Sequence, residues 1–162
     1  MRPWLTRGLG MAILHAIAGT ALAKAAVYDP TGLTTPKIIV IALLVGAAAL
    51  WSAIDGWRCA VKAADRPAGR ARPRGLVRED LGRTWVIAAL IAGPVSGILS
   101  VIGRAAFVDQ TGTSELWPAL SGGAAFTALL VLVPAGLGMF TGGRLHPARK
   151  AAAGREPRSA GE

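Results

Sequence analysis

The chain has 162 residues, of which 52% are hydrophobic and 21 are glycine, yet its formal net charge is +9. So apolar a composition, without a long polar domain, excludes an ordinary soluble domain and is typical of an integral membrane protein. Its basic residues cluster beside apolar stretches, and the largest basic segment, residues 58–83, contains no aromatic residue on which a base could stack. We therefore expect anionic lipid headgroups, and no nucleic acid, as the counter-charge.

The first apolar span is predicted over about residues 8–27. It follows Arg2, Trp4 and Arg7, a pattern typical of interfacial anchors. A basic start, an apolar run and Ala21-Leu22-Ala23, with its two small residues, also fit a secretory signal with a cleavage site. We favour a span that is kept, because the apolar run is long and an internal repeat continues through the possible cleavage site.

The second span is predicted over about residues 37–57, after a short turn rich in Asp, Pro and Gly. Asp55 and Arg58 lie near its end at an i, i+3 spacing, which places both on one helical face. We expect these two side chains to form an ion pair, which lowers the cost of placing Asp55 at the membrane edge.

The basic segment 58–83 holds eight of the eighteen Lys and Arg residues. Its Pro, Gly and Arg content predicts a disordered link. Near its end, Glu79 and Arg83 have an i, i+4 spacing that predicts a short helix lying at the membrane surface.

The third and fourth spans are predicted over about 84–103 and 122–143. Glycines in them, Gly93 with Gly97 and Gly138 with Gly142, are expected to let neighbouring helices approach closely. The membrane domain is thus expected to cover 1–145, and the polar segment 146–162 to form a disordered cytoplasmic tail.

The distribution of charge predicts the orientation. Only Lys24, Lys37 and Arg104 fall outside the cell if the basic segment 58–83 lies inside. By the positive-inside rule, both termini are then cytoplasmic in a multi-pass protein of the cell membrane. Because every copy inserts the same way, any homodimer is expected to be parallel.

An internal repeat relates the two halves of the chain. Residues 24–32, KAAVYDPTG, recur as 104–112, RAAFVDQTG, with five identical positions. The sequence therefore predicts an all-α four-helix bundle built from two helical hairpins in the same orientation. Repeats of this kind are related by an axis along the membrane normal, and any cavity is expected at their interface.

Two ionisable residues are candidates for a substrate or proton site. His15 lies midway along the first span, where it is either a neutral, hydrogen-bonded packing residue or a functional group. Asp55 lies nearer the cytoplasmic edge, either in a structural ion pair or at a gate. Lys24 and Arg104 lie at matching places at the outer edge, where reaching out to lipid headgroups explains both.

The segments Trp51–Arg58, Arg78–Trp85 and Ala124–Pro134 carry a resemblance to a known group. The chain resembles the small actinobacterial four-transmembrane proteins classed with the drug/metabolite transporter superfamily. The resemblance implies transport of a small molecule. Small multidrug-resistance relatives carry a membrane-embedded glutamate in the first span, where this chain has His15 and no acid, so proton-coupled export of cationic drugs is not expected.

No residue pattern predicts an enzyme. The sequence has no converging Ser, His and Asp set, no paired carboxylates and no phosphate-binding glycine loop. Cys59 is the only cysteine and, with only two scattered histidines, predicts neither a disulfide nor a metal site, and no cofactor is expected. Two functions stay open: a small-molecule transporter, favouring a homodimer, and a non-catalytic scaffold or accessory subunit in a hetero-complex.

Overall fold

Helices make up almost all of the described chain. The computed structural model describes residues 3–64, 74–108 and 116–153. The helices are α1 (Pro3–Tyr28), α2 (Thr34–Ala64), α3 (Arg74–Phe107), the short α4 (Leu116–Pro118), the π-helical turn η3 (Ala119–Gly123) and α5 (Ala124–Ala153).

Four helical stretches are long and apolar enough to cross a membrane: Trp4–Tyr28, Thr34–Lys62, Glu79–Phe107 and Leu116–Gly142. At 1.5 Å of rise per residue, each exceeds a hydrocarbon core of about 30 Å. This confirms the predicted all-α fold with four spans and makes the chain a multi-pass membrane protein.

The helices extend beyond the predicted spans. The separate surface helix expected around Glu79 and Arg83 is wrong, because α3 runs unbroken from Arg74 to Phe107. The expected disordered tail is wrong for its first residues, because α5 continues to Ala153. Alanine, arginine and lysine are good helix formers, so a helix continues through them after hydrophobicity falls. The rest of the predicted link and tail, residues 65–73 and 154–162, lies outside the described residues.

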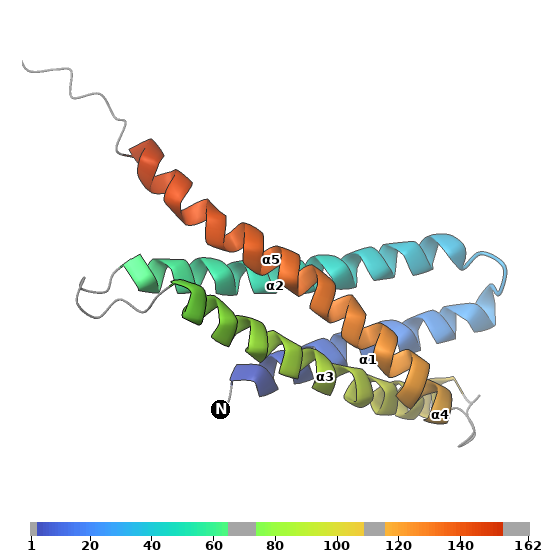
Figure 1. Cartoon of the computed structure of the whole chain (residues 1–162). Helices are drawn as coiled ribbons and strands as arrows, with labels where there is room; N and C mark the ends of the chain where they lie inside the picture. The colour runs from blue at the N-terminus through green and yellow to red at the C-terminus, as the bar shows by residue number, and fades with distance from the viewer. Residues whose placement is uncertain (1–2, 65–73, 109–115, 154–162) are drawn as a thin grey trace, which may run out of the picture.

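The main helix contacts join equivalent helices of the two halves. The helix α1 packs along α3, and α2 packs along α5, whereas α1 and α2 make few contacts with each other. Within each main pair the helices run in the same direction, as Figure 1 shows. The second hairpin is closed by contacts of α3 with α5 and η3. The first hairpin is therefore open, and its two helices are held by the second.

The helix bundle has two opposite ends, which we call the turn end and the terminal end. The turn end holds residues 29–33, between α1 and α2, and the beginning of α4. The terminal end holds the beginnings of α1 and α3 and the far end of α2 (Figure 1).

Asp29 organises the first turn. Its Oδ1 accepts hydrogen bonds from the backbone N–H of Gly32 at 2.9 Å, the hydroxyl of Thr31 at 3.0 Å and the backbone N–H of Thr31 at 3.1 Å. A Cβ at position 32 would collide with this carboxylate, which explains the glycine. The hydrogen bonds, that from Gly32 first, lower the pKa of Asp29 below its ordinary value of 3.8. The second copy of the repeat turn, around residue 109, lies outside the described residues.

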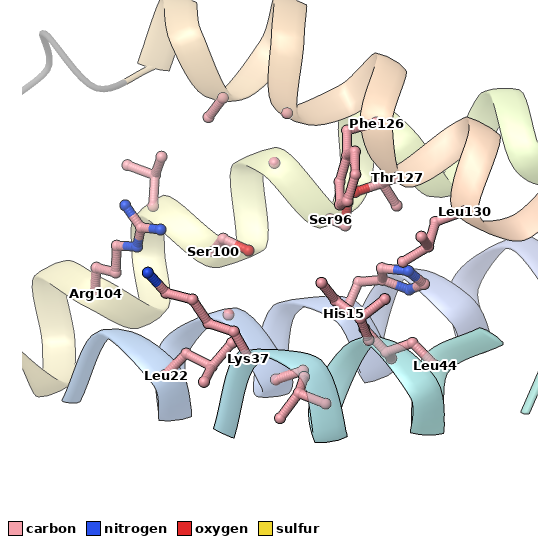
Figure 2. Close-up of a pocket in the computed structure, with 18 of the residues that line it drawn as sticks. His15, Leu22, Lys37, Leu44, Ser96, Ser100, Arg104, Phe126, Thr127 and Leu130 are labelled. Carbon is pink, nitrogen blue, oxygen red and sulfur yellow. The ribbon is translucent and has the colours of Figure 1, made fainter. Parts of the chain in front are cut away.

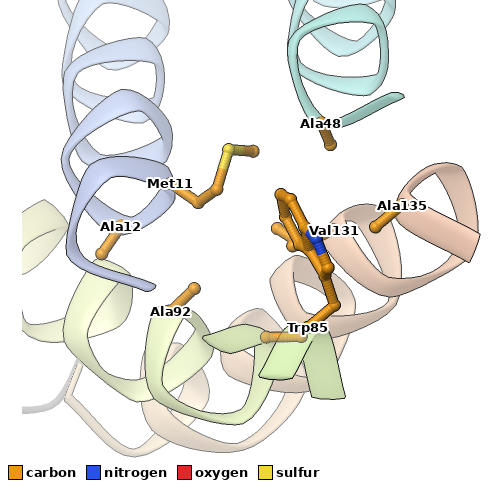
Figure 3. Packing of buried hydrophobic residues seen from close by; sticks show 8 residues of the cluster. Met11, Ala12, Ala48, Trp85, Ala92, Val131 and Ala135 are labelled. Carbon is orange, nitrogen blue, oxygen red and sulfur yellow. The ribbon is translucent and has the colours of Figure 1, made fainter. Parts of the chain in front are cut away.

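The buried core lies toward the terminal end. It contains one residue or more from each of the four long helices: Met11, Ala12, Ala48, Trp85, Ala89, Ala92, Val131 and Ala135. Figure 3 shows Met11 and the indole of Trp85 between these alanines. Because most of the core residues are alanine, the helix backbones lie close together, and this half of the bundle has little room for a solute.

The four glycines predicted to pack helices lie where helices meet. A Cβ at Gly93 would be 2.5 Å from the carbonyl oxygen of Ala124, and one at Gly97 would be 2.8 Å from that of Ala119. Likewise, a Cβ at Gly138 would collide with the carbonyl oxygen of Ala49, and one at Gly142 with that of Ala53. In the first pair, Gly93 thus lies where α3 meets α5 and Gly97 where α3 meets η3, and the second pair lies at the α2–α5 contact.

Candidate functional site

A cavity of about 480 Å³ occupies the half of the bundle toward the turn end. It reaches that end, because Lys37, Arg104 and Pro118 lie within the first or last turn of their spans. All four spans line it, so it lies between the two halves of the repeat, where parallel repeats are expected to form one. The lining residues are His15, Ala18, Gly19, Leu22, Lys37, Val40, Ile41, Leu44, Ser96, Gly97, Ser100, Val101, Arg104, Pro118, Ala119, Gly123, Phe126, Thr127 and Leu130.

His15 forms the inner end of the cavity, one helical turn from the core residue Met11. The residue is only 8% exposed, and its Nδ1 lies 2.8 Å from the carbonyl oxygen of Met11. Because a carbonyl oxygen can only accept, Nδ1 carries a proton and donates it. In the neutral imidazole, Nε2 is then an acceptor. It is buried and has no hydrogen-bond partner among the residues the structure describes.

Two cations lie at the other end of the cavity. Lys37 comes from the first turn of α2, and Arg104 from the last turn of α3. Figure 2 shows both side chains toward one end of the cavity and the imidazole of His15 at the other. Of the described residues that line the cavity, none is acidic. The site therefore has two basic side chains at its mouth.

The wall between these ends is mixed. Serine and threonine hydroxyls come from Ser96, Ser100 and Thr127. Ser96 donates its hydroxyl proton to the carbonyl oxygen of Gly93 at 2.8 Å, so this hydroxyl retains acceptor capacity toward the cavity. The apolar part of the wall consists of Leu22, Val40, Ile41, Leu44, Val101, Phe126 and Leu130. An elongated molecule with an apolar body matches this lining.

The terminal end is closed by a polar and aromatic cluster, which we call the inner cluster: Arg7, Trp51, Asp55 and Trp85. Arg7 Nε donates to Asp55 Oδ2 at 2.7 Å, with side chains 15% and 8% exposed. The Arg7 guanidinium carbon lies 6.0 Å from the centroid of the Trp85 ring. Trp51 meets Trp85 edge to face, with ring centroids 6.4 Å apart. These contacts join α1, α2 and α3 below the cavity.

The two ionisable candidates from the sequence occupy different sites. His15 lines the cavity, whereas Asp55 belongs to the inner cluster and not to the cavity wall. The expected ion pair of Asp55 with Arg58 is wrong: the partner is Arg7, and Arg58 is exposed. Arg58, one helical turn from Asp55, lies on the exposed surface of α2. The carboxylate of Asp55 instead faces α1 inside the bundle.

Sequence reasoning did not place Lys37 in a cavity and assigned Arg104 to lipid headgroups alone. The signal for both was their position, since each basic residue lies within one turn of a span end on a different helix. Only the packing of α2 and α3 around a common space brings them together. In the described part of the chain, no three His, Cys, Asp or Glu side chains are grouped so as to hold a metal ion.

Comparison with known proteins gives no family. No family model matches the chain, and no curated protein matches it.

Proposed function

We propose that this chain is a small-molecule transporter of the cell membrane, with both termini in the cytoplasm. The observation that carries the proposal is the cavity: it lies between the repeated halves, reaches the turn end and is closed toward the terminal end. This is the arrangement expected of a carrier that faces one side of the membrane. In the proposed orientation, the cavity faces outward.

The helix contacts favour movement between two states. The two main contacts, α1 with α3 and α2 with α5, each join one helix from each half. Apart from the Arg7–Asp55 ion pair at the terminal end, few contacts hold α1 to α2, so this pair can separate or close toward the turn end as the bundle rocks. Access from the terminal end requires opening the inner cluster, with its ion pair between Arg7 and Asp55.

Cysteine labelling tests this proposal without knowledge of the substrate. Ser100→Cys is placed in a Cys59→Ser background and reconstituted into sealed vesicles, and a membrane-impermeant maleimide is added to one side or the other. A transporter exposes the cavity to both sides in turn, so we expect labelling from both, faster from the turn end. Asp55→Asn should raise the labelling rate from the terminal end by weakening the inner cluster.

Thr31→Cys in the same background is the sidedness control, because this exposed turn residue should react from the turn end only. A scaffold gives a different result. In that case Ser100→Cys reacts from the turn end alone, and Asp55→Asn does not change this. That outcome would replace the transporter with a non-catalytic accessory subunit.

A further inference from the structure

We propose that the cavity binds an elongated apolar alcohol or phenol, whose hydroxyl group donates a hydrogen bond to Nε2 of His15 at the inner end. The inference rests on the proposed function and deepens it, because it names a substrate class for the same cavity. Binding is measured separately from movement across the membrane, so the two can fail independently.

The need for a donor follows from the geometry of His15. Its Nδ1 donates to the carbonyl oxygen of Met11, so Nε2 of the neutral ring has a lone pair and no proton. His15 lines the cavity, and this buried nitrogen has no hydrogen-bond partner among the residues that the structure describes. A buried acceptor in this state is unfavourable, and a hydrogen bond from a ligand relieves the cost.

A second polar group at the same depth also offers an acceptor. A Cβ at Gly19 would be 3.4 Å from the hydroxyl oxygen of Ser100, and α1 and α3 run in the same direction (Figure 1). Four residues earlier on each helix, His15 and Ser96 therefore lie at about the same depth. Ser96 is 3% exposed and donates its hydroxyl proton to the carbonyl oxygen of Gly93 at 2.8 Å, so its oxygen is left to accept. A ligand hydroxyl suits this pair of acceptors, whereas an ether or ketone oxygen does not.

The donor is expected to be uncharged. The charged side chains of the described lining, Lys37 and Arg104, lie at the mouth, and the described lining contains no acidic residue. An ammonium group at His15 would stand near the middle of a span without a counter-charge, which is costly. Among uncharged donors a hydroxyl group is small, and this suits a nitrogen that the protein covers closely.

The apolar body follows from the size and composition of the wall. A volume of about 480 Å³ far exceeds the space that one water molecule needs. Aliphatic side chains and Phe126 form much of its surface. Burying an apolar body against them contributes favourable free energy roughly in proportion to the area covered. A water molecule would supply a donor to Nε2 but would leave this surface unused.

The test observes Nε2 itself. The full chain is labelled with ¹⁵N-histidine in a His146→Gln background, which leaves His15 as the only histidine, and is placed in phosphatidylcholine nanodiscs. The probes are 2-naphthol, which carries a hydroxyl group, and 2-methoxynaphthalene, whose oxygen can only accept. We expect 2-naphthol to move the Nε2 resonance upfield in a saturable way, because the nitrogen then accepts a hydrogen bond. The ether should leave the resonance in place.

Competition between the probes measures the contribution of the hydroxyl group. About a fivefold excess of 2-methoxynaphthalene over 2-naphthol in the membrane should halve the shift, as expected from the loss of one hydrogen bond. No shift with 2-naphthol would overturn the proposal. An equal shift with both probes would also overturn it, because the apolar body alone, or the water it displaces, would then explain the effect. These readings need no substitution in the cavity.

A matched pair of variants tests whether the ligand lies in the cavity. Ala18 lines the cavity one helical turn from His15, whereas Ala21 on the same helix is exposed and does not line it. Ala18→Phe should weaken 2-naphthol binding about tenfold by overfilling the site, and Ala21→Phe should leave it unchanged. The unliganded Nε2 should keep the shift of an unprotonated nitrogen in both variants, which reports an intact bundle. Equal titrations in the two variants would mean that the ligand reaches His15 by another route and would overturn the cavity site.

The combination with cysteine labelling separates binding from transport. A shift with 2-naphthol together with one-sided labelling of Ser100→Cys would retain this site and reject only transport. Two-sided labelling without the shift would retain transport and reject this class of ligand.

Discussion

At the scale of single residues, Asp55 shows what a local pattern can and cannot predict. The sequence indicated that a carboxylate near a span end needs a cation, and this holds in the structure. It did not identify the partner, because Arg7 lies 48 positions away and only the packing of α1 against α2 and α3 brings it near. For His15, the sequence predicted a position near the middle of the span. Its hydrogen bond to the Met11 carbonyl oxygen, and the absence of a partner for Nε2 among the described residues, could be seen only in the structure.

The Arg7–Asp55 pair should be worth more to stability than any exposed pair. Removing one partner leaves a charge in a largely buried place, so Asp55→Asn should lower the free energy of unfolding by about 3 kcal/mol. Arg58→Gln, at an exposed position on the same helix, should change it by less than about 0.5 kcal/mol. Unfolding of the detergent-solubilised protein in mixed micelles measures both. A loss in Arg58→Gln as large as in Asp55→Asn would contradict the assignment of Arg7 as the partner.

The turn at Asp29 should depend on pH in one direction. The folded-state pKa of Asp29 is lowered by the N–H of Gly32 and by Thr31, so the ionised carboxylate stabilises the turn. This stabilisation is fully present above the ordinary value of 3.8 and is lost as the pH falls through the lowered pKa. Carboxyl ¹³C shifts should show titration below 3.8, and the amides of Thr31 and Gly32 should lose protection there. A midpoint at or above the ordinary value would exclude these hydrogen bonds.

At the scale of elements, the sequence predicted four helices and their approximate centres because apolar runs of about 20 residues have few alternatives. It misplaced their ends. Hydropathy marks where a helix leaves the hydrocarbon, whereas propensity decides where it stops, and α3 and α5 both continue through charged residues. The small residues were readable as packing positions, but their partners were not, since the pattern is equally consistent with several helix pairs.

Two glycines of α5 provide a matched test of close packing. A Cβ at Gly138 would collide with the Ala49 carbonyl oxygen of α2, whereas one at Gly136 meets no atom within 4 Å. Gly138→Ala should therefore lower the free energy of unfolding by about 1–3 kcal/mol, because a backbone atom must move. Gly136→Ala should raise it by about 0.5–1 kcal/mol through helix propensity. Both substitutions are measured in the same mixed micelles, and similar effects on the free energy of unfolding would contradict the close approach of α2 and α5.

At the scale of the whole molecule, the repeat predicted two hairpins in one orientation and placed any cavity between them. It could not predict that each half packs mainly on the other half and that the first hairpin is open. That arrangement depends on which faces carry the small residues. It gives the bundle a dense half near Trp85 and a hollow half near Ser100, and so separates a closed end from an accessible one.

The orientation of this asymmetric bundle is the last prediction. The segment 58–83 holds eight of eighteen basic residues. Among the basic residues that the structure describes, only Lys24, Lys37 and Arg104 lie toward the turn end, so we expect the turn end outside. A reporter that is active only in the cytoplasm should be active after Glu162 and near Gly69, and inactive after Thr111. Activity after Thr111 would place the cavity mouth toward the cytoplasm. Activity at only one of the two inner positions would mean that the chain crosses the membrane an odd number of times between them. That result would contradict the pairing of α3 with α5 as two membrane-spanning helices that line the cavity.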